Sequence, residues 1–216
     1  TYFPPGHITD NLSELIGFFV SEGCSCSPQT FTITQHESEI NQRIRYLLKD
    51  CFDYKQSFID KDYKISVEIN SVNIVRYFQA LGIDVWAKSA DKVIPPPILG
   101  GTENTLKSFL RGYFEGDGSV EKSGGISCSS KSPELIKQIQ LALLNFGIIS
   151  RIRRKMVKVK ESRRPYWVLY FFGNNVDIFS QKIGFISTRK QIALNKIIGK
   201  IRNTNTDIIP FGNFYI

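Results

Sequence analysis

The sequence predicts an α+β protein made of two pseudo-symmetric halves, and three observations support this prediction. Two long segments match one another in order, as in proteins built from an internal repeat. Within each segment, apolar residues alternate between helical and strand-like spacing. A short Pro- and Gly-rich stretch separates the segments. We therefore expect a first half over residues 1–93, a linker over 94–104 and a second half over 105–216, each half with the order αββαββα.

The repeat is clearest near the start of each half. A shift of 95 residues places residues 15–23 (LIGFFVSEG) on residues 110–118 (LRGYFEGDG) without a gap. Further along the chain the shift grows to 102, and it then carries Gly82 onto Gly184. The second half therefore holds seven additional residues (102 − 95) between these two regions. An ordered set of matches at two successive offsets is not expected by chance.

Each expected element of the first half has its own local signal. Asp10 or Asn11 can cap a first helix, which Gly23 ends. A turn at residues 27–29 precedes alternating apolar and polar residues, which is typical of a strand hairpin. Apolar residues then recur at helical spacing over residues 38–51 and form two strand-like runs over residues 53–69. They return to helical spacing over residues 72–81, before Gly82. The expected elements are a helix ending at Glu22, a hairpin over 24–35, a helix over 38–51, two strands over 53–69 and a helix over 72–81.

The second half repeats this order and adds a closing helix over residues 188–201. Between the halves, the run Ile94-Pro95-Pro96-Pro97-Ile98 is expected to be stiff and extended, and Gly100-Gly101 to be flexible.

The charge balance favours a polyanionic partner. Lys and Arg outnumber Asp and Glu by 28 to 20, which gives a formal charge of +8. A basic surplus of this kind is typical of proteins that bind nucleic acid or acidic membrane surfaces. No apolar run approaches the roughly 18 residues that a membrane span needs, and no signal sequence is evident, so we expect no membrane association. The four cysteines show no disulfide framework, which favours a reducing, intracellular compartment.

The alternative interpretation of the cysteines is a zinc site. Cys24 and Cys26 could be joined by His7 or His36, but the spacing is wrong for the common zinc fingers. The absence of a second Cys pair further disfavours this site.

Small residues mark one face of the first helix in each half. They lie four residues apart at Ser13, Gly17 and Ser21 in the first half and at Ser108, Gly112 and Gly116 in the second. Because small side chains let two helix backbones approach closely, we expect the two helices to cross along these faces. The aromatic residues that flank the small ones, Phe18, Phe19, Tyr113 and Phe114, should then pack into the core of their own half.

This crossing would bring two carboxylates together, because Glu22 and Asp117 lie at the C-terminal ends of the two helices. They would repel one another and would face the negative ends of their helix dipoles. Divalent cations would compensate this repulsion, since Mg²⁺ prefers hard carboxylate oxygens and also binds phosphate. A metal between two acids and a phosphodiester can activate water and stabilise the leaving oxygen. The alternative is that both acids are exposed helix-end residues that are close only by accident.

The repeat also nominates two lysines for catalysis. Lys88 and Lys190 coincide at the 102-residue shift, and each follows a helix-ending glycine by six residues. A lysine beside each scissile phosphate could stabilise the charge that develops during hydrolysis. Chance coincidence of two surface lysines is the alternative, and Lys92 and Arg189 are the neighbours to consider next.

The two motif segments resemble the signature helix of the LAGLIDADG homing endonucleases, in the single-chain class with two motifs. Residues 109–118 (FLRGYFEGDG) are the stronger match, while the first motif departs from the pattern at residues 18–21 but keeps its acid-Gly end. The Ile94-Pro95 pair and residues 146–148 are also similar to the family. The resemblance implies metal binding by Glu22 and Asp117 together with the preceding Ser21 and Gly116, Mg²⁺-dependent cleavage of both DNA strands with short 3′ overhangs, and Mn²⁺ or Ca²⁺ as substitutes for binding.

The resemblance further implies a saddle of antiparallel strands that straddles double-stranded DNA, and the charge pattern agrees with it. Residues 151–164 carry eight basic residues against one acid, and Arg151, Arg153 and Lys155 alternate as they would on one strand face. A solvated, accidentally basic hairpin is the alternative. The residues expected to contact DNA are Gln29, Thr32, Thr34, Gln35, Lys55, Lys64, Lys122, Ser129, Lys131, Arg151, Arg153, Lys155, Lys158, Arg163 and Arg164.

Two functions other than DNA cleavage stay open for this fold, namely a DNA-binding regulator that does not cut and an RNA-splicing maturase. A regulator would be expected to lack one or both motif acids, whereas both are present. We expect a monomer that acts as a pseudo-dimer without an obligate protein partner, in an organelle or a prokaryotic cytoplasm. An intron, an intein or a free-standing gene could each encode it.

Overall fold

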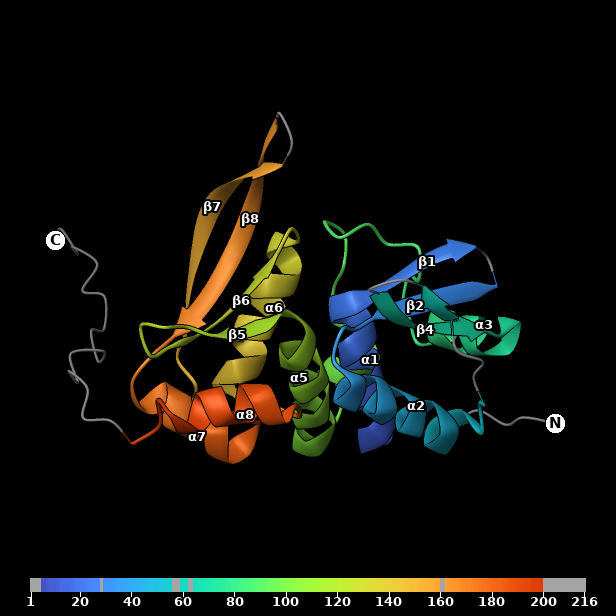
Figure 1. Ribbon diagram of the computed structural model, residues 1–216, viewed down its shortest axis with the longest axis horizontal. Helices are drawn as coiled ribbons and strands as arrows, with labels where there is room; N and C mark the ends of the chain where they lie inside the picture. Colours follow the sequence, from blue (N-terminus) through green and yellow to red (C-terminus); the bar gives the residue numbers. More distant parts are fainter. Residues whose placement is uncertain (1–4, 28, 56–58, 62–63, 160–161, 200–216) are drawn as a thin grey trace, which may run out of the picture.

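The protein folds into two halves of the same design, as the repeat predicted (Figure 1). The computed structural model describes residues 5–27, 29–55, 59–61, 64–159 and 162–199. The first half contains, in chain order, α1 (Asp10–Glu22), β1 (Gly23–Ser27), β2 (Thr30–Thr34), α2 (Ser38–Phe52), β3 (Ile59–Lys61), β4 (Lys64–Asn70) and α3 (Val72–Ala80). After the short α4 (Pro96–Leu99), the second half contains α5 (Glu103–Asp117), β5 (Gly118–Val120), β6 (Ile126–Ser130), α6 (Pro133–Leu144), β7 (Arg151–Val159), β8 (Ser162–Phe171), α7 (Asn174–Lys182) and α8 (Thr188–Asn195). This is the predicted α+β class.

Each half has one four-stranded antiparallel sheet, and the two sheets share one topology. The strand orders are β1-β2-β4-β3 and β5-β6-β8-β7, so equivalent strands occupy equivalent places. The sheets differ most in the second hairpin, where β7 and β8 have nine and ten residues against three and seven for β3 and β4. The seven additional residues that the shift in offset predicted therefore lengthen this hairpin, which projects beyond the rest of the second sheet (Figure 1).

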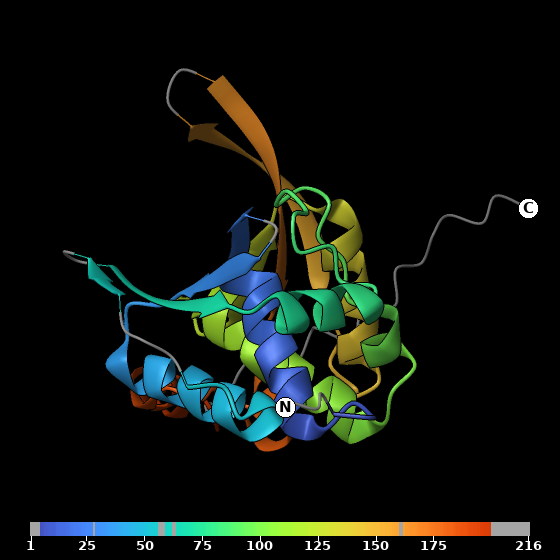
Figure 2. The ribbon, with the colours of Figure 1, turned by 90° about the vertical axis from the view of Figure 1, so that its right-hand side faces the viewer.

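One face of each sheet packs on the helices and forms the core. On β2, Phe31 and Ile33 are fully buried, while the three threonines that alternate with them lie on the opposite face. Phe19 of α1 meets Phe31 and Phe78 edge-on in the first core, and Phe114 of α5 meets Phe171 and Phe179 in the second. Phe19 and Phe114 thus pack into their own halves, as predicted. Figures 1 and 2 show α1 and α5 side by side at the centre of the molecule.

Three details of the predicted elements are corrected by the structure. The cap of α1 is Thr9, whose side chain accepts a hydrogen bond from the Leu12 amide at 3.1 Å, rather than Asp10 or Asn11. The linker is not extended throughout, because residues 96–99 form one helical turn with Pro96 in its first position, where a missing amide proton costs nothing. Helix α8 ends at Asn195, and Ile201, where the closing helix was expected to end, lies outside the described residues.

None of the helices in the described ranges combines the length and the apolar composition that crossing a membrane would require.

Candidate metal and nucleic-acid site

Helices α1 and α5 approach so closely that their glycines cannot be replaced without a clash. A Cβ atom on Gly17 would collide with the backbone of Phe109, and one on Gly112 would collide with the Glu14 carbonyl. Near the start of the crossing, the buried Ser13 hydroxyl donates a hydrogen bond to the Thr105 carbonyl at 2.6 Å. Gly116 faces the Ser21 side chain at the other end. The small-residue faces therefore meet as predicted, except that Ser13 contacts Thr105 and Ser108 is only half-buried.

The crossing places Glu22 close enough to Asp117 to affect its pKa, and the same two lysines, Lys92 and Lys190, act on both carboxylates. The pKa of Asp117 is raised to about 7, mainly by burial and then by the nearby Glu22 carboxylate, against the lowering effect of Lys92 and Lys190. Burial likewise raises the pKa of Glu22, and Lys92, Lys190 and His36 oppose this rise. Each carboxylate thus prefers to be neutralised, either by a proton or by a cation.

Two lysines cap the C-terminal ends of the motif helices. The Nζ atom of Lys92 donates to the carbonyls of Val20 at 2.9 Å and Gly23 at 2.8 Å. The Nζ atom of Lys190 donates to the equivalent carbonyls of α5, those of Glu115 and Gly118, the latter at 2.8 Å, and also to that of Phe114 at 3.2 Å. A cation is favourable at a helix C-terminus, where carbonyl groups lack helical partners.

These contacts correct the predicted lysine pair. Lys88 is exposed on the loop after α3, and Lys92 takes the place equivalent to that of Lys190. The 102-residue shift selected the wrong lysine because Lys92 follows Gly82 by ten residues, whereas Lys190 follows Gly184 by six. Only the contacts with the helix ends reveal the pair. Burial lowers the pKa of both lysines, and the nearby carboxylates oppose this effect.

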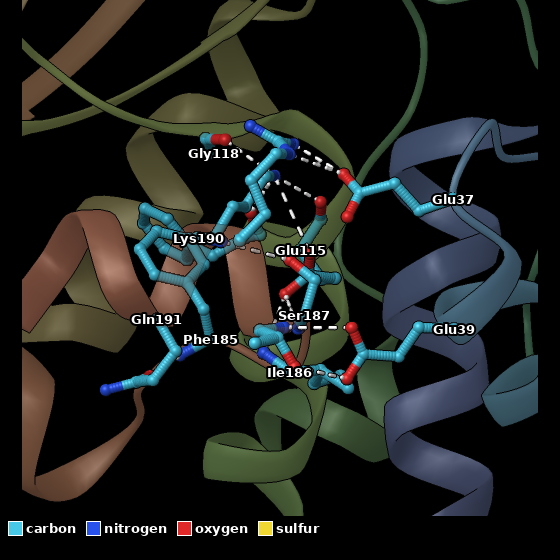
Figure 3. A network of polar contacts seen from close by, with 12 residues as sticks. Glu37, Glu39, Glu115, Gly118, Phe185, Ile186, Ser187, Lys190 and Gln191 are labelled. Carbon is cyan, nitrogen blue, oxygen red and sulfur yellow. Dashed lines mark hydrogen bonds and ion pairs between the residues drawn. The ribbon is translucent and has the colours of Figure 1, made fainter.

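A buried carboxylate that the sequence did not single out holds the loop before α8. Glu115 accepts hydrogen bonds from the backbone amides of Ile186 at 2.6 Å and Ser187 at 3.1 Å, and its Oε1 lies 4.0 Å from the Lys190 Nζ (Figure 3). Helix α8 itself contacts the first half, because Arg189 pairs with Glu37 and the Thr188 amide donates to Glu39 at 2.9 Å. The network therefore ties Lys190 to both halves.

A groove runs from Asp117 along the outer face of the second sheet. Asp117, Ser129, Arg153, Lys155 and Tyr170 are among its lining residues. The strand register explains this arrangement, because Arg153 pairs with Val168 and Val168 pairs with Ser129, so these side chains point to the same face. A second hollow beside Asp117 is lined by Lys92, Lys131 and Tyr166, among others. The Lys131 ammonium lies 5.5 Å from the centre of the Tyr166 ring.

The structure brings only some of the predicted DNA-contacting residues together. In the regular register of β7 and β8, Arg153, Lys155 and Arg164 share the groove face, whereas Lys158 and Arg163 lie on the opposite face. Lys122 lines a separate hollow against α8. In the second half, Arg151, Arg153 and Lys155 are exposed on β7, as are Lys158, Arg163 and Arg164 nearer the hairpin tip. In the first half, Thr32 and Thr34 lie on the outer face of β2, opposite Glu68 and Ser66 of β4. Gln29, Lys55, Lys122 and Ser129 are exposed, and Gln35 and Lys131 are half-buried. The backbone of Lys64 belongs to β4, but its side chain lies outside the described residues.

Comparison with known proteins places this arrangement in a family. A model of the LAGLIDADG-like domain matches residues 104–184. The replication factor C small subunit of Methanocaldococcus jannaschii is 33% identical over 211 residues, which are 96% of this chain and 11% of that protein. The glutamine–fructose-6-phosphate aminotransferase of the same organism is 25% identical over 202 residues, 91% of this chain and 18% of that protein. The chain thus spans less than a fifth of the length of either relative.

Two solved structures share the fold. The structure of I-DmoI in complex with DNA and Ca superposes with a TM-score of 0.61 at 14% identity, and covers 87% of this chain and 97% of that chain. Full-length DUF199/WhiA from Thermatoga maritima superposes with a TM-score of 0.59 at 17% identity, and covers 94% of this chain and 65% of that chain. These two likenesses show that the fold is shared, and the match of residues 104–184 to the LAGLIDADG-like domain model, together with the repeated motif helices, supports a LAGLIDADG protein with two motifs in one polypeptide.

Proposed function

We propose that this chain is a site-specific endonuclease that makes a metal-dependent double-strand break in a long, loosely palindromic DNA duplex. The observation that carries the proposal is the convergence of Glu22 and Asp117 at the crossing of α1 and α5, beside Lys92. A structural role does not explain two half-buried acids at the negative ends of two helices whose pKa values are both raised. A site that uses their charge to hold a cation and a phosphodiester does explain them.

The residues at the crossing fit a divalent metal. Glu22 and Asp117 would hold it through carboxylate oxygens, which suit Mg²⁺, with Mn²⁺ or Ca²⁺ as substitutes for binding. Within the described ranges, no group of three or more His, Cys, Asp and Glu side chains gathers, so water and DNA phosphate oxygens would complete the coordination. When bound, the metal would supply activation of water and stabilisation of the leaving oxygen. The roles given to Ser21 and Gly116 stay predictions, and the Ser21 hydroxyl here donates to helix carbonyls at 3.1 and 3.2 Å.

The outer faces of the two sheets are the proposed DNA surface. The groove along β6, β8 and β7 joins Asp117 to the basic side chains of Arg153 and Lys155. Such cations would neutralise phosphates, while the threonines of β2 offer hydroxyl groups suited to base edges. Both half-sites lie in one polypeptide, so we propose that a monomer cuts both strands without an obligate protein partner.

Selection of cleavable sites from a randomised duplex library tests this proposal. With Mg²⁺, the protein should enrich one family of related sites and should cut both strands of each. Recovery of sites that the protein binds tightly but never cuts, in Mg²⁺ or Mn²⁺, would contradict cleavage and would favour a DNA-binding regulator. The likeness to DUF199/WhiA is of the same order as that to I-DmoI, so fold similarity supports both functions about equally and the acids favour cleavage. Preferential binding of structured RNA would favour a maturase.

The relatives support a mobile origin. Two proteins with unrelated names each contain a segment similar to nearly all of this chain, although the segment is a small part of either protein. A segment that recurs in unrelated proteins is best explained by insertion. We therefore propose that this nuclease serves the mobility of its own coding element, of the intron or intein type.

A further inference from the structure

One carboxylate lies on the sheet face that is proposed to meet DNA phosphates. Glu121 lines the same groove as Asp117, Arg153 and Lys155. It follows β5 directly, and its backbone amide donates to the Gly125 carbonyl at 2.8 Å in the turn that leads to β6. A carboxylate repels phosphates, so an acid at this place weakens DNA binding unless it meets a hydrogen-bond donor of the DNA.

The carboxylate of Glu121 is held on the groove side of the sheet. The Ser127 hydroxyl donates a hydrogen bond to its Oε1 atom. Ser127 pairs in register with Ser119 of β5 and Tyr170 of β8, and all three residues line the groove. Glu121 also borders the hollow beside α8, but the hydrogen bond to Ser127 turns its carboxylate toward the groove. The position of the carboxylate is therefore fixed before a ligand arrives.

The second carboxylate oxygen of Glu121 has no protein partner. Among the residues that the structure describes, no ion pair includes Glu121 and no hydrogen bond reaches its Oε2 atom. The neighbouring Arg153 guanidinium lies instead 5.4 Å from the centre of the Tyr170 ring. An ion-pairing role thus does not account for this acid, and one of its oxygens is available to a ligand in the groove.

The chemistry of base edges decides which base such an oxygen can recognise. In the major groove cytosine presents the N4 amino donor, whereas guanine presents two acceptors and thymine presents an acceptor and a methyl group. Adenine presents its N6 donor beside the N7 acceptor, which repels a carboxylate but suits an amide that both donates and accepts. A group that only accepts hydrogen bonds therefore favours cytosine over the other three bases.

We infer that Glu121 is a specificity-determining residue, which accepts a hydrogen bond from the N4 amino group of one cytosine in the half-site bound by the second sheet. Ser127 is the residue that positions it. The inference rests on the proposed function, in which DNA lies on this sheet. Glu121 lowers affinity for every sequence by repelling phosphates, and only cytosine compensates this repulsion, so the acid acts mainly by excluding the other bases.

Selection of bound duplexes from a randomised library in Ca²⁺ tests this inference with the matched variants Glu121→Gln and Glu134→Gln. Glu134 is exposed on α6, away from the groove, so its variant loses the same charge elsewhere. In the parent's site we expect one position that prefers cytosine. In Glu121→Gln the same position should prefer adenine, because glutamine pairs with adenine N6 and N7, and the cytosine-to-adenine preference should fall by at least about tenfold. Glu134→Gln should leave every position unchanged.

Two further measurements separate base recognition from a general charge effect. Fluorescence anisotropy should show that Glu121→Gln binds an unrelated duplex more tightly than the parent. Ser127→Ala should weaken the cytosine preference at the same position without creating a preference for adenine. If Glu121→Gln keeps the parental site, or changes affinity equally for all sites, the inference is overturned while the proposed function stands. A parent protein that enriches no duplex contradicts the proposed function as well, so the two failures are distinguishable.

Discussion

Asp117 and Glu22 are equivalent by the repeat, but their surroundings disfavour their charges to different degrees. The pKa of Asp117 rises to about 7, whereas that of Glu22 rises less, and a tyrosine hydroxyl near Asp117 only partly offsets its burial. In the metal-free protein Asp117 is therefore half-protonated near neutral pH. A cation that binds the pair would displace this proton, so metal affinity should increase as pH rises through 7.

The shifted pKa of Asp117 predicts how stability depends on pH without metal. Between pH 4 and 7 the folded protein holds a proton on Asp117 that the unfolded chain has lost, so the free energy of unfolding falls as pH rises, and the cost is complete above pH 7. Asp117→Asn removes this cost. In EDTA at pH 8, urea denaturation should show the variant to be more stable than the parent by about 1–3 kcal/mol, with no difference near pH 4.

The exposed Asp91→Asn serves as the control for this measurement and should show no gain at either pH. If Asp117→Asn is as stable as the parent at pH 8, then the carboxylate is not destabilised by its position at the crossing.

Sequence reasoning at the residue scale succeeded for the acids and failed for one lysine. Glu22 and Asp117 follow from helical spacing and a gap-free shift, both of which are local properties. The place of Lys92 depends on the path of the loop after Gly82, which is four residues longer than its counterpart in the second half (ten against six). Loop paths are set by tertiary contacts, and the repeat alone could not indicate which lysine returns to the helix end. Glu115 was missed for the same reason, since its partners are backbone amides 71 and 72 residues away.

At the scale of elements, the crossing of α1 and α5 determines the geometry of the site. Replacing Gly17 with Ala would place a methyl group against the Phe109 carbonyl and the Tyr113 amide, both of which belong to rigid helical backbone. Because the helices would have to separate, we expect the free energy of unfolding to fall by about 1–3 kcal/mol or more in urea denaturation. Metal affinity should also fall, since the carboxylates would move apart.

Gly100→Ala is a matched control for this prediction. Its added Cβ would lie 3.6 Å from the Pro96 carbonyl oxygen, an ordinary van der Waals distance. Its stability should stay within about 0.5 kcal/mol of the parent. Equal stabilities of the Gly17→Ala and Gly100→Ala variants would show that the close approach of the helices is not required.

The long β7–β8 hairpin predicts a specific salt dependence of DNA binding. Each lysine or arginine that neutralises a phosphate contributes about 0.9 to the slope of log K against log salt. The double variant Arg153→Gln/Lys155→Gln should therefore bind more weakly and should lower the slope by about 2, as measured by fluorescence anisotropy at several salt concentrations.

The control for the hairpin removes the same charge elsewhere. Lys137 and Lys182 are exposed on α6 and α7, away from the groove that leads to Asp117. Lys137→Gln/Lys182→Gln should therefore leave the slope close to that of the parent. If both double variants lower the slope equally, net charge rather than the hairpin accounts for DNA affinity.

At the scale of the whole molecule, one chain holds two halves that share a backbone plan but differ in chemistry. The order of elements and the division into halves could be predicted, because hydrophobic periodicity and the repeat report on local structure. The contacts between the halves could not. Arg189 pairs with Glu37, and Thr188 with Glu39, across 152 and 149 residues, and no periodic pattern in the sequence indicates such distant pairs (Figure 3). The small-residue faces of the two motif helices were the only pattern in the sequence that indicated an interface between the halves.

These differences between the halves indicate how the target is read. The second half presents a long basic hairpin, and the first presents short strands with polar, mostly uncharged side chains. We therefore expect a target whose two half-sites are related only loosely, with more of the phosphate contacts made to the half bound by β7 and β8.

The proposed acid pair is tested most directly by cleavage and binding measurements on Glu22→Gln and Asp117→Asn with a duplex that the parent cuts. Both amides keep the size of the side chain but lose the charge that would hold Mg²⁺. We expect each variant to lose cutting of both strands while it binds the duplex within about threefold of the parent in Ca²⁺ or in metal-free buffer. Cleavage by both variants at the parental rate would contradict the assignment of Glu22 and Asp117 as the metal-binding pair.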